Sequence, residues 1–268
     1  MEANLLITAE QIRRIARQQE MAVGVIEKDY AQSWLLKGFA ENDEIRDSFV
    51  LKGGTAIRKI HFPKAWRFSE DLDFTAIGNK DANTIRKEMQ SVLERLRDES
   101  GINCLLESFH PTIGSIIANV QFTGPLSYSN RIRHDITLNE KMVLVPERRS
   151  IVSDYPDLPS FEVLAYPLAE VLVEKIRSIM QRGYSRDYYD VWRLLKAREF
   201  RGLEVKSLLL QKCKLNAVSY RPELLFAPDR LNEAGSFWVT GLGHLTKELP
   251  NFDVVVSELR AQLSFLQE

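Results

Sequence analysis

The sequence is poor in cysteine and has no long apolar run. Its 268 residues include only 2 cysteines, Cys104 and Cys213, which stand far apart and outside any Cys-x-x-Cys pattern. This scarcity argues against a disulfide scaffold and against a cysteine-based zinc site. No stretch approaches the roughly 18 uninterrupted apolar residues of a membrane span, and Leu5–Ile7 is too short for the core of a signal peptide. We therefore expect a cytoplasmic protein with no membrane partner.

The chain also lacks an excess of charge of either sign. Its 36 Lys and Arg residues against 37 Asp and Glu residues give a net charge of −1. That balance argues against a general nucleic-acid coat protein, although local basic patches are compatible with it. The hydrophobic fraction of 44% excludes intrinsic disorder. At roughly 100–200 residues per domain, the length suits one large domain, or a catalytic core with a helical partner.

The first third of the chain predicts two helices, a short strand and a glycine turn. Thr8-x-x-Gln11 forms a capping box, which indicates the start of a helix. A second helix is predicted from apolar residues at spacings of three and four, namely Ile26, Tyr30, Ala31, Trp34 and Leu35. The apolar run 48–51 then leads into Gly53-Gly54, and a short helix is expected over 55–60.

The middle of the chain alternates in a way typical of strands, and its last third is helical. We expect strands over 68–77, 115–122 and 131–138, a possible strand over 142–145, and a charged amphipathic helix over 82–96. From Pro167 onward the pattern is helical, and prolines mark a break before it. We therefore predict an α/β (α+β) fold, with a mixed-sheet core over residues 1–160 and a helical C-terminal lobe over 161–268.

An acidic pair carries the strongest chemical signal. In a strand, Asp71 and Asp73 project from one face, while Leu72 and Phe74 pack on the other. Two neighbouring carboxylates repel each other unless a cation lies between them. This spacing suits Mg²⁺ or Mn²⁺ held together with substrate phosphates. The alternative is a solvated strand edge.

The glycine pair upstream strengthens the metal interpretation. Gly53-Gly54 lies between a strand and a helix, where exposed backbone N–H groups favour a polyphosphate. A phosphate-binding turn followed by an acidic pair is what metal-assisted nucleotidyl transfer requires. Asp135, within an alternating strand, is the candidate third carboxylate. Its alternative role is a salt bridge to Arg131 or Arg133 on the same strand face.

Two residues of the C-terminal helices are further candidates. Lys175 falls inside an apolar stripe, where it must either extend to solvent or meet an anion such as a phosphate. Asp187 lies closer to the apolar stripe of the next helix than Asp190 does, although a first-turn acid is also favoured by the helix dipole. Arg186 beside it can bind a phosphate or pair with an acid.

Taken together, these stretches resemble the AbiEii family of abortive-infection toxins, the nucleotidyltransferase-like toxins of type IV toxin–antitoxin systems that include the MenT-type enzymes. The matching stretches are Leu51–Ala56, Arg67–Phe74, Glu174–Arg177 and Arg186–Val191. The resemblance implies a nucleotidyltransferase-like core, transfer of nucleotides from an NTP, in some members onto tRNA 3′ ends, and neutralisation by a cognate antitoxin.

The resemblance also implies roles for particular residues. The motif glycines fall on Gly53 and Gly54, and the metal-binding acids on Asp71 and Asp73. The essential lysine falls on Lys175 and the essential aspartate of the Arg-Asp motif on Asp187. The family often has Gly-Ser where this chain has Gly53-Gly54-Thr55. In this chain Thr55 supplies a hydroxyl instead of the serine.

We therefore predict a metal-dependent nucleotidyltransferase toxin that transfers NMP from an NTP to RNA, such as a tRNA 3′ end. The predicted catalytic residues are Asp71, Asp73, Lys175 and Asp187. The predicted nucleotide-binding residues are Lys52, Gly53, Gly54, Thr55, Arg67, Ser69 and Arg186. The predicted ligands of Mg²⁺ or Mn²⁺ are Asp71, Asp73 and Asp135. The cations expected to attract RNA are Lys64, Arg67, Arg131, Arg133, Arg148, Arg149, Arg182 and Arg186. The alternatives are a small-molecule nucleotidyltransferase and a non-catalytic binding module.

Overall fold

The computed structural model describes residues 6–138 and 140–267, which form two compact units. The first unit comprises residues 1–140 and 146–166, and the second comprises residues 141–145 and 167–268. Residues 141–145 fall in the second unit, although the sequence-based division is at residue 160. Residues 161–166 fall in the first unit, because strand β7 (Phe161–Ala165) pairs with strand β1 (Phe49–Lys52).

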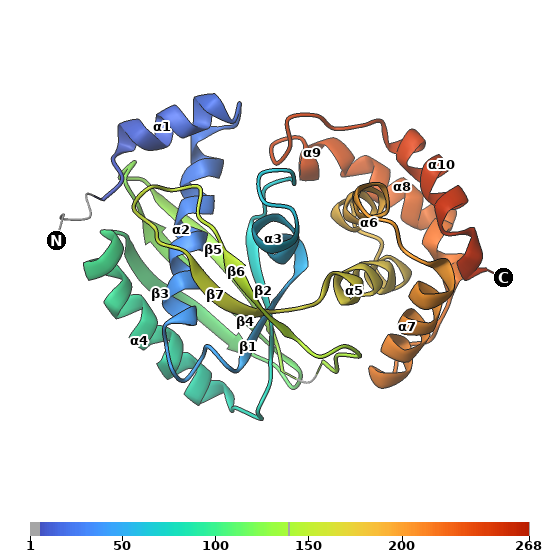
Figure 1. Ribbon diagram of the computed structural model, residues 1–268, viewed down its shortest axis with the longest axis horizontal. Coiled ribbons are helices and arrows are strands. Elements are labelled where there is room, and N and C mark those ends of the chain that lie inside the picture. The colour runs from blue at the N-terminus through green and yellow to red at the C-terminus, as the bar shows by residue number, and fades with distance from the viewer. Residues whose placement is uncertain (1–5, 139, 268) are drawn as a thin grey trace. The chain divides into compact units, whose positions relative to one another are not determined.

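The first unit is built on one mixed seven-stranded sheet of order β3-β4-β5-β2-β1-β7-β6 (Figure 1). The remaining strands are β2 (Asp71–Ala76), β3 (Asn103–Pro111), β4 (Ser115–Thr123), β5 (Ser129–Thr137) and β6 (Glu147–Ile151). The β2–β5 and β1–β7 pairs are parallel, and the other pairs are antiparallel. The mixed α/β architecture predicted from the sequence is confirmed.

Helices α2 (Val23–Ala40) and α4 (Ala82–Ser100) cover one face of this sheet (Figure 1). The strand residues that face them are apolar and buried; Leu72 and Phe74, for example, are 0% and 2% exposed. The five apolar residues predicted for one face of the second helix are all buried. The capping box also forms at helix α1 (Ala9–Gln18), where the Thr8 side chain accepts a hydrogen bond from the Gln11 backbone. Apolar burial on this face leaves the opposite face of β2 and β5 to polar side chains.

Some predicted elements differ from the structure. Residues 142–145 are not a strand, because the N–H groups of Val143 and Leu144 donate to the Glu170 carboxylate instead of to a neighbouring strand. The short helix expected over 55–60 is α3 (Gly53–Ala56) continued by a π-helical turn, η1 (Ile57–His61).

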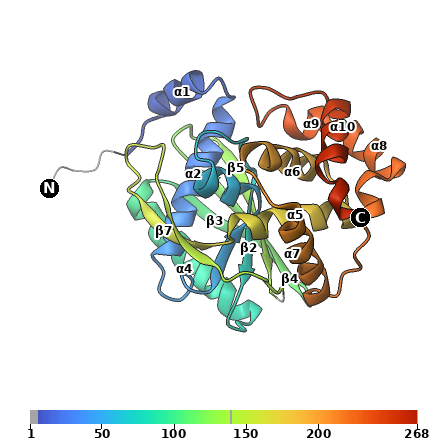
Figure 2. The same cartoon turned by 45° about the vertical axis from the view of Figure 1, so that its right-hand side comes forward.

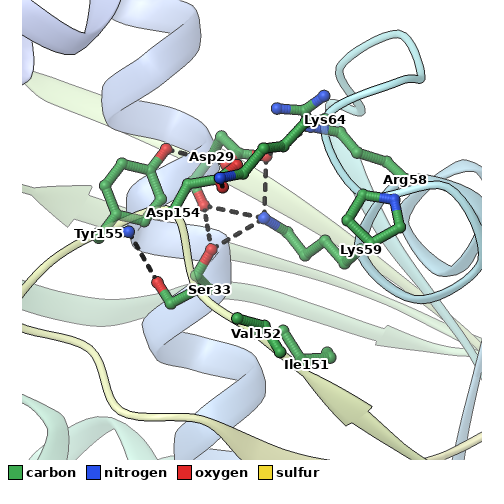
Figure 3. Close-up of a pocket in the computed structure, with 11 residues that line it drawn as sticks. Asp29, Ser33, Arg58, Lys59, Lys64, Ile151, Val152, Asp154 and Tyr155 are labelled. Carbon is green, nitrogen blue, oxygen red and sulfur yellow. Dashed lines mark hydrogen bonds and ion pairs between the residues drawn. The ribbon is translucent and has the colours of Figure 1, made fainter.

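A buried ionic cluster fastens this π-helical turn to α2. The Asp29 carboxylate accepts hydrogen bonds from the Lys59 ammonium at 2.9 Å, the Arg58 Nε at 3.3 Å and the Tyr155 hydroxyl at 2.8 Å (Figure 3). The Ser33 hydroxyl lies 2.8 Å from the Lys59 ammonium. Burial alone would raise the pKa of Asp29, but Lys59 and Arg58 lower it to about 2. The helix that follows the glycine pair is therefore anchored by charge pairing within the core.

The second unit is helical, as predicted from Pro167 onward (Figure 2). Its helices are α5 (Leu168–Gln181), α6 (Ser185–Ala197), α7 (Gly202–Leu215), α8 (Pro228–Ser236), α9 (Trp238–Leu242) and α10 (Phe252–Gln262). Helix α5 packs against both α6 and α7. In the part of the chain that the structure describes, every helix is too short or too polar to cross a membrane.

Candidate functional site

The polar face of the sheet aligns three predicted site residues across adjacent strands. Asp73 of β2 is the register partner of Lys52 on β1 and of Asp135 on β5. Asp71 is the register partner of Arg133 in the same way. Because register partners point to the same side of a sheet, the row brings two acids and a lysine together. This arrangement arises from the parallel pairing of β2 with β5, which the sequence did not specify.

The glycine pair closes directly onto this row. Gly53 has a φ of +70°, a left-handed conformation, and a Cβ placed on it would overlap the Asp73 carboxylate. A Cβ on Gly54 would meet the Arg67 guanidinium at 2.9 Å and the Ser69 hydroxyl at 3.2 Å. Glycine is therefore required at Gly53 both by backbone conformation and by close approach. The two glycines lie against three of the predicted nucleotide- and metal-binding side chains.

Hydroxyl and cationic side chains complete the surroundings of the turn. The Thr55 hydroxyl donates to the Asp71 carbonyl at 2.7 Å, which ties the turn to the first acid of the pair. Arg67 and Ser69 are 3% and 8% exposed, and Arg67 donates to the Phe68 carbonyl. Lys52 donates to the Thr137 hydroxyl at 3.1 Å and forms an ion pair with Glu140. Thus the structure places the six predicted nucleotide-binding residues of this unit around the acidic pair.

The donor set suits a divalent cation held by two carboxylates. Among residues 6–138 and 140–267, no group of three or more His, Cys, Asp or Glu side chains is arranged to hold a metal ion. Asp71 and Asp73 nevertheless share a strand face, and Mg²⁺ is commonly bound by one or two carboxylates plus substrate phosphates. The residues present fit such an ion when the remaining ligands come from a triphosphate.

Asp135 has a protein partner on its own strand. Its carboxylate accepts hydrogen bonds from Arg133, with Nη2 at 2.9 Å, which is the salt bridge considered as its alternative role. Hydrogen bonding to Asp135 raises the pKa of the Arg133 guanidinium, and the nearby charges of Asp71 and Asp73 add to that rise. Arg133 thus partly balances the acidic row. The assignment of Asp135 as a third metal ligand stays a prediction.

The second unit holds its own buried charge cluster. The Lys175 ammonium lies 2.9 Å from Asp187 and 2.9 Å from Asp190, and Arg182 approaches Asp187 at 3.4 Å. Lys175, Asp187 and Asp190 are 8%, 2% and 0% exposed. Lys175 therefore does not extend to solvent, because two carboxylates hold its charge inside the helical unit. Asp190 is as buried as Asp187.

Several functional candidates escaped the sequence analysis. Asp190 could have been found from its spacing, because residues three apart share one face of a helix. Glu140 could not, because it lies outside the strands and its partner Lys52 is 88 residues away in the sequence. The Lys212 ammonium, 0% exposed, lies 2.9 Å from Glu170 and 3.2 Å from Glu174, an arrangement set by the packing of α5 against α7.

Most of the cations predicted to attract RNA have carboxylate partners. The pairs are Lys64–Asp154, Arg131–Glu107, Arg133–Asp135, Arg148–Asp47, Arg149–Glu147 and Arg182–Asp187. Such partly exposed pairs contribute little to stability, about 0–1 kcal/mol each. The paired carboxylates make the electrostatic potential near these cations less positive than the cations alone would. A polyanion can still compete with the carboxylates for the cations.

Comparison with known proteins finds a matching family model and similar solved structures. A family model described as "Nucleotidyl transferase AbiEii toxin, Type IV TA system" matches residues 34–257. Among solved structures, MenT4, the nucleotidyltransferase toxin Rv2826c from Mycobacterium tuberculosis H37Rv, superimposes with a TM-score of 0.69 at 20% identity. That alignment covers 98% of this chain and 90% of MenT4. The fold and family predicted from the four sequence stretches are confirmed.

A second structure is more remote. An antigenic nucleotidyltransferase-like protein from Paracoccidioides brasiliensis aligns with a TM-score of 0.42 at 12% identity, covering 72% of this chain and 90% of that protein. A search of curated proteins by sequence finds no match.

Proposed function

This chain belongs to the AbiEii family of nucleotidyl transferase toxins of type IV toxin–antitoxin systems, and from that premise we propose that it transfers NMP from an NTP to an RNA acceptor, such as a tRNA 3′ end, in a metal-dependent reaction. The observation that carries the proposal is the close approach of the left-handed Gly53 turn to the Asp73 carboxylate. It brings the backbone that we propose to bind phosphate and a side chain that we propose to bind the ion to one point of one sheet.

In this proposal the glycine turn and its surroundings bind the triphosphate. Backbone N–H groups at Gly53 and Gly54 are the anion donors, as at other helix starts that follow a glycine turn. The Arg67 guanidinium, packed beside Gly54, adds positive charge close to the same backbone. Thr55 orients the turn through its hydrogen bond to the Asp71 carbonyl.

Asp71 and Asp73 would hold Mg²⁺ or Mn²⁺, which supplies charge stabilisation to the attacking and leaving oxygens when bound. The acceptor hydroxyl oxygen forms a bond to the α-phosphorus, the bond from that phosphorus to the β-phosphate oxygen breaks, and pyrophosphate leaves. The proton of the acceptor hydroxyl passes to a carboxylate. Asp135 and Asp187 are the two candidates for that base. Each is paired with a cation, Asp135 with Arg133 and Asp187 with Lys175.

Lys175 is proposed to provide the charge that the family's essential lysine provides. Its ammonium is already held by Asp187 and Asp190, so its position is fixed before any ligand binds. Buried charges act through a lower effective dielectric than exposed ones, which strengthens their interaction with a phosphate. We assign Asp187 to the positioning of Lys175 as well as to the candidate base role.

The type IV family also implies an antitoxin partner. We propose that a cognate antitoxin protein neutralises this chain and that the toxin acts in the cytoplasm, where its RNA substrate is found. The arginines that are paired with carboxylates are the proposed contacts of the RNA backbone.

The test is to incubate the purified protein with each labelled NTP in turn, with Mg²⁺ and with total cellular RNA and protein. We expect one NTP to label RNA, and the label to be lost in Asp71→Asn and Asp73→Asn variants that keep the wild-type unfolding midpoint. Asp43→Asn, which removes an exposed carboxylate outside the sheet, serves as the control and should retain labelling.

Two results would overturn parts of the proposal. Label found only on a small molecule would favour the small-molecule nucleotidyltransferase considered from the sequence. An absence of transfer with every NTP, in a protein that binds its antitoxin, would favour the non-catalytic binding module.

A further inference from the structure

The helical unit contains a cavity that the proposed reaction does not use. Its volume is about 230 Å³, and it lies where the start of α6 meets the end of α8 and helix α9. The residues that matter most are Tyr184, Arg186, Glu233, Phe237 and Gly241. All of them belong to the second unit, so the cavity is complete within that unit.

Two aromatic rings of this cavity are exposed. Tyr184 is 52% exposed and Phe237 is 60% exposed, although burying such rings is favourable. The Arg182 guanidinium lies 4.8 Å from the centre of the Tyr184 ring, which is stacking distance for a cation on an aromatic face. Exposed rings beside a cavity mark a surface that is suited to a flat ligand.

A hydrogen bond joins the two helices beside the cavity. Gly183 has a φ of +65° and turns the chain between α5 and α6, which presents Tyr184 at the surface. The Ser185 hydroxyl, 5% exposed, donates to the Ala234 carbonyl at 2.8 Å and ties the start of α6 to α8. Tyr184 and Phe237 therefore lie at the ends of two helices that are joined by a hydrogen bond.

The polar groups of the cavity have complementary hydrogen-bonding character. Arg186 is a donor for ring nitrogens, carbonyl oxygens or phosphate, and Glu233 is an acceptor for an exocyclic amine. Aromatic rings that stack, an arginine and a carboxylate are the groups with which proteins bind unpaired bases.

We propose that this cavity binds a nucleobase, which stacks on Phe237 and Tyr184 and contacts Arg186 and Glu233. The proposal deepens the proposed function and rests on it, since a nucleotidyltransferase that acts on RNA has two sources of bases. One source is the base of the NTP, and the other is an unpaired base of the acceptor RNA. Both present the same flat, hydrogen-bonding chemistry.

The test measures equilibrium binding of base-bearing and base-free probes to ring-substituted variants. The probes are the four NTPs against inorganic tripolyphosphate, and a short single-stranded oligoribonucleotide against an abasic oligomer of the same length. Phe237→Leu and Tyr184→Leu remove a ring but keep an apolar side chain, while Phe237→Trp keeps a ring. Tyr128→Leu is the control, because Tyr128 is also exposed, at 73%, and lies in the first unit.

We expect Phe237→Leu to weaken binding of one base-bearing probe by about tenfold or more, in line with the loss of a stacked base. The base-free probes should bind these variants as they bind the wild type. Phe237→Trp should keep the wild-type affinity for the base-bearing probe, because it keeps a ring. A loss confined to NTPs identifies the NTP base as the ligand, and a loss confined to the oligoribonucleotide identifies the acceptor base.

A blocking variant makes the test independent of the rings. A Cβ placed on Gly241 meets no atom within 4 Å, so Gly241→Leu has room to enter the cavity while both rings remain. It should lower the same affinity as Phe237→Leu does. Unchanged affinities in both variants, or equal losses with base-bearing and base-free probes, overturn the proposal, as does binding of the antitoxin alone at these residues. Failure of the proposed function is a separate result: no NTP labels any acceptor in the wild type.

Discussion

The backbone of Gly53 lies so close to Asp73 that a Cβ at Gly53 would overlap the Asp73 carboxylate. The backbone φ of +70° adds a second reason for glycine at this position. Gly53→Ala should therefore lower the free energy of unfolding by about 1–2 kcal/mol for the left-handed backbone, and by about 1–3 kcal/mol more for the displaced carboxylate. It should also abolish transfer. Denaturant unfolding and the labelling assay measure the two effects.

Gly78 provides the matched control for this substitution. Its φ is +86°, but a Cβ placed on it meets no atom within 4 Å. Gly78→Ala should show only the backbone cost of about 1–2 kcal/mol and should keep activity. Equal destabilisation by the two substitutions, with activity retained in both, would show that the approach of Gly53 to Asp73 has no functional weight.

The acidic pair of this site could be predicted because its signal is contained in one short segment of the sequence. Asp71 and Asp73 alternate with two buried residues, and this pattern predicts a strand face without knowledge of neighbouring strands. The pairing of Asp73 with Asp135 depends on a parallel register between strands far apart in sequence, for which no short-range signal exists. Strand β3 was missed because it lies at the sheet edge, where Leu105 is 62% exposed and the apolar alternation is weak.

Lys175 should stabilise the helical unit independently of its role in the reaction. Lys175→Met removes the cation that Asp187 and Asp190 share and leaves two buried carboxylates with less compensation. We expect a loss of about 3–5 kcal/mol in unfolding free energy, as is found when one partner of a buried ion pair is removed. Adding Asp190→Asn should recover part of that loss, because only one carboxylate then lacks the ammonium.

Activity distinguishes the two roles of Lys175. Asp190→Asn keeps the Lys175 ammonium beside Asp187 and should retain measurable transfer. The double variant Lys175→Met/Asp190→Asn lacks the ammonium and should remain inactive, even though part of its stability is recovered. Wild-type turnover in Lys175→Met would limit this lysine to a structural role. The sequence pattern could not have revealed this pairing in full, since it depends on the packing of α5 against α6.

The Asp29 cluster predicts a specific loss of stability in acid. The pKa of Asp29 is lowered from 3.8 to about 2 in the folded protein, against the opposing effect of burial. The stabilisation is therefore fully present above pH 4, and it is lost as the pH falls from about 4 to 2. Its size is about 2 kcal/mol, from the shift in pKa. Unfolding free energies measured across this range should show the decline.

Asp29→Asn isolates this contribution. The variant should be less stable at neutral pH by about 3–5 kcal/mol, since Lys59 and Arg58 lose their buried partner. Its difference from the wild type should shrink between pH 4 and pH 2. Asp43→Asn, which removes an exposed partner of Arg46, should leave both the stability and its pH dependence nearly unchanged. A constant difference between Asp29→Asn and wild type across this range would contradict the lowered pKa.

Arg131 and Arg133 test whether the acceptor is a polyanion. Both lie on β5 and each is paired with a carboxylate, Glu107 or Asp135, that a phosphate can replace. If each arginine contacts one RNA phosphate, the plot of log affinity against log salt should become shallower in the double variant Arg131→Ala/Arg133→Ala. The magnitude of its negative slope should fall by about 1.4, at about 0.7 per contact with single-stranded RNA. NTP affinity should change much less. The control removes Arg201 and Arg221, which are also paired with exposed acids but lie in the helical unit. An unchanged salt slope in the β5 variant, or the same change in the control, would place the RNA contacts elsewhere on the molecule.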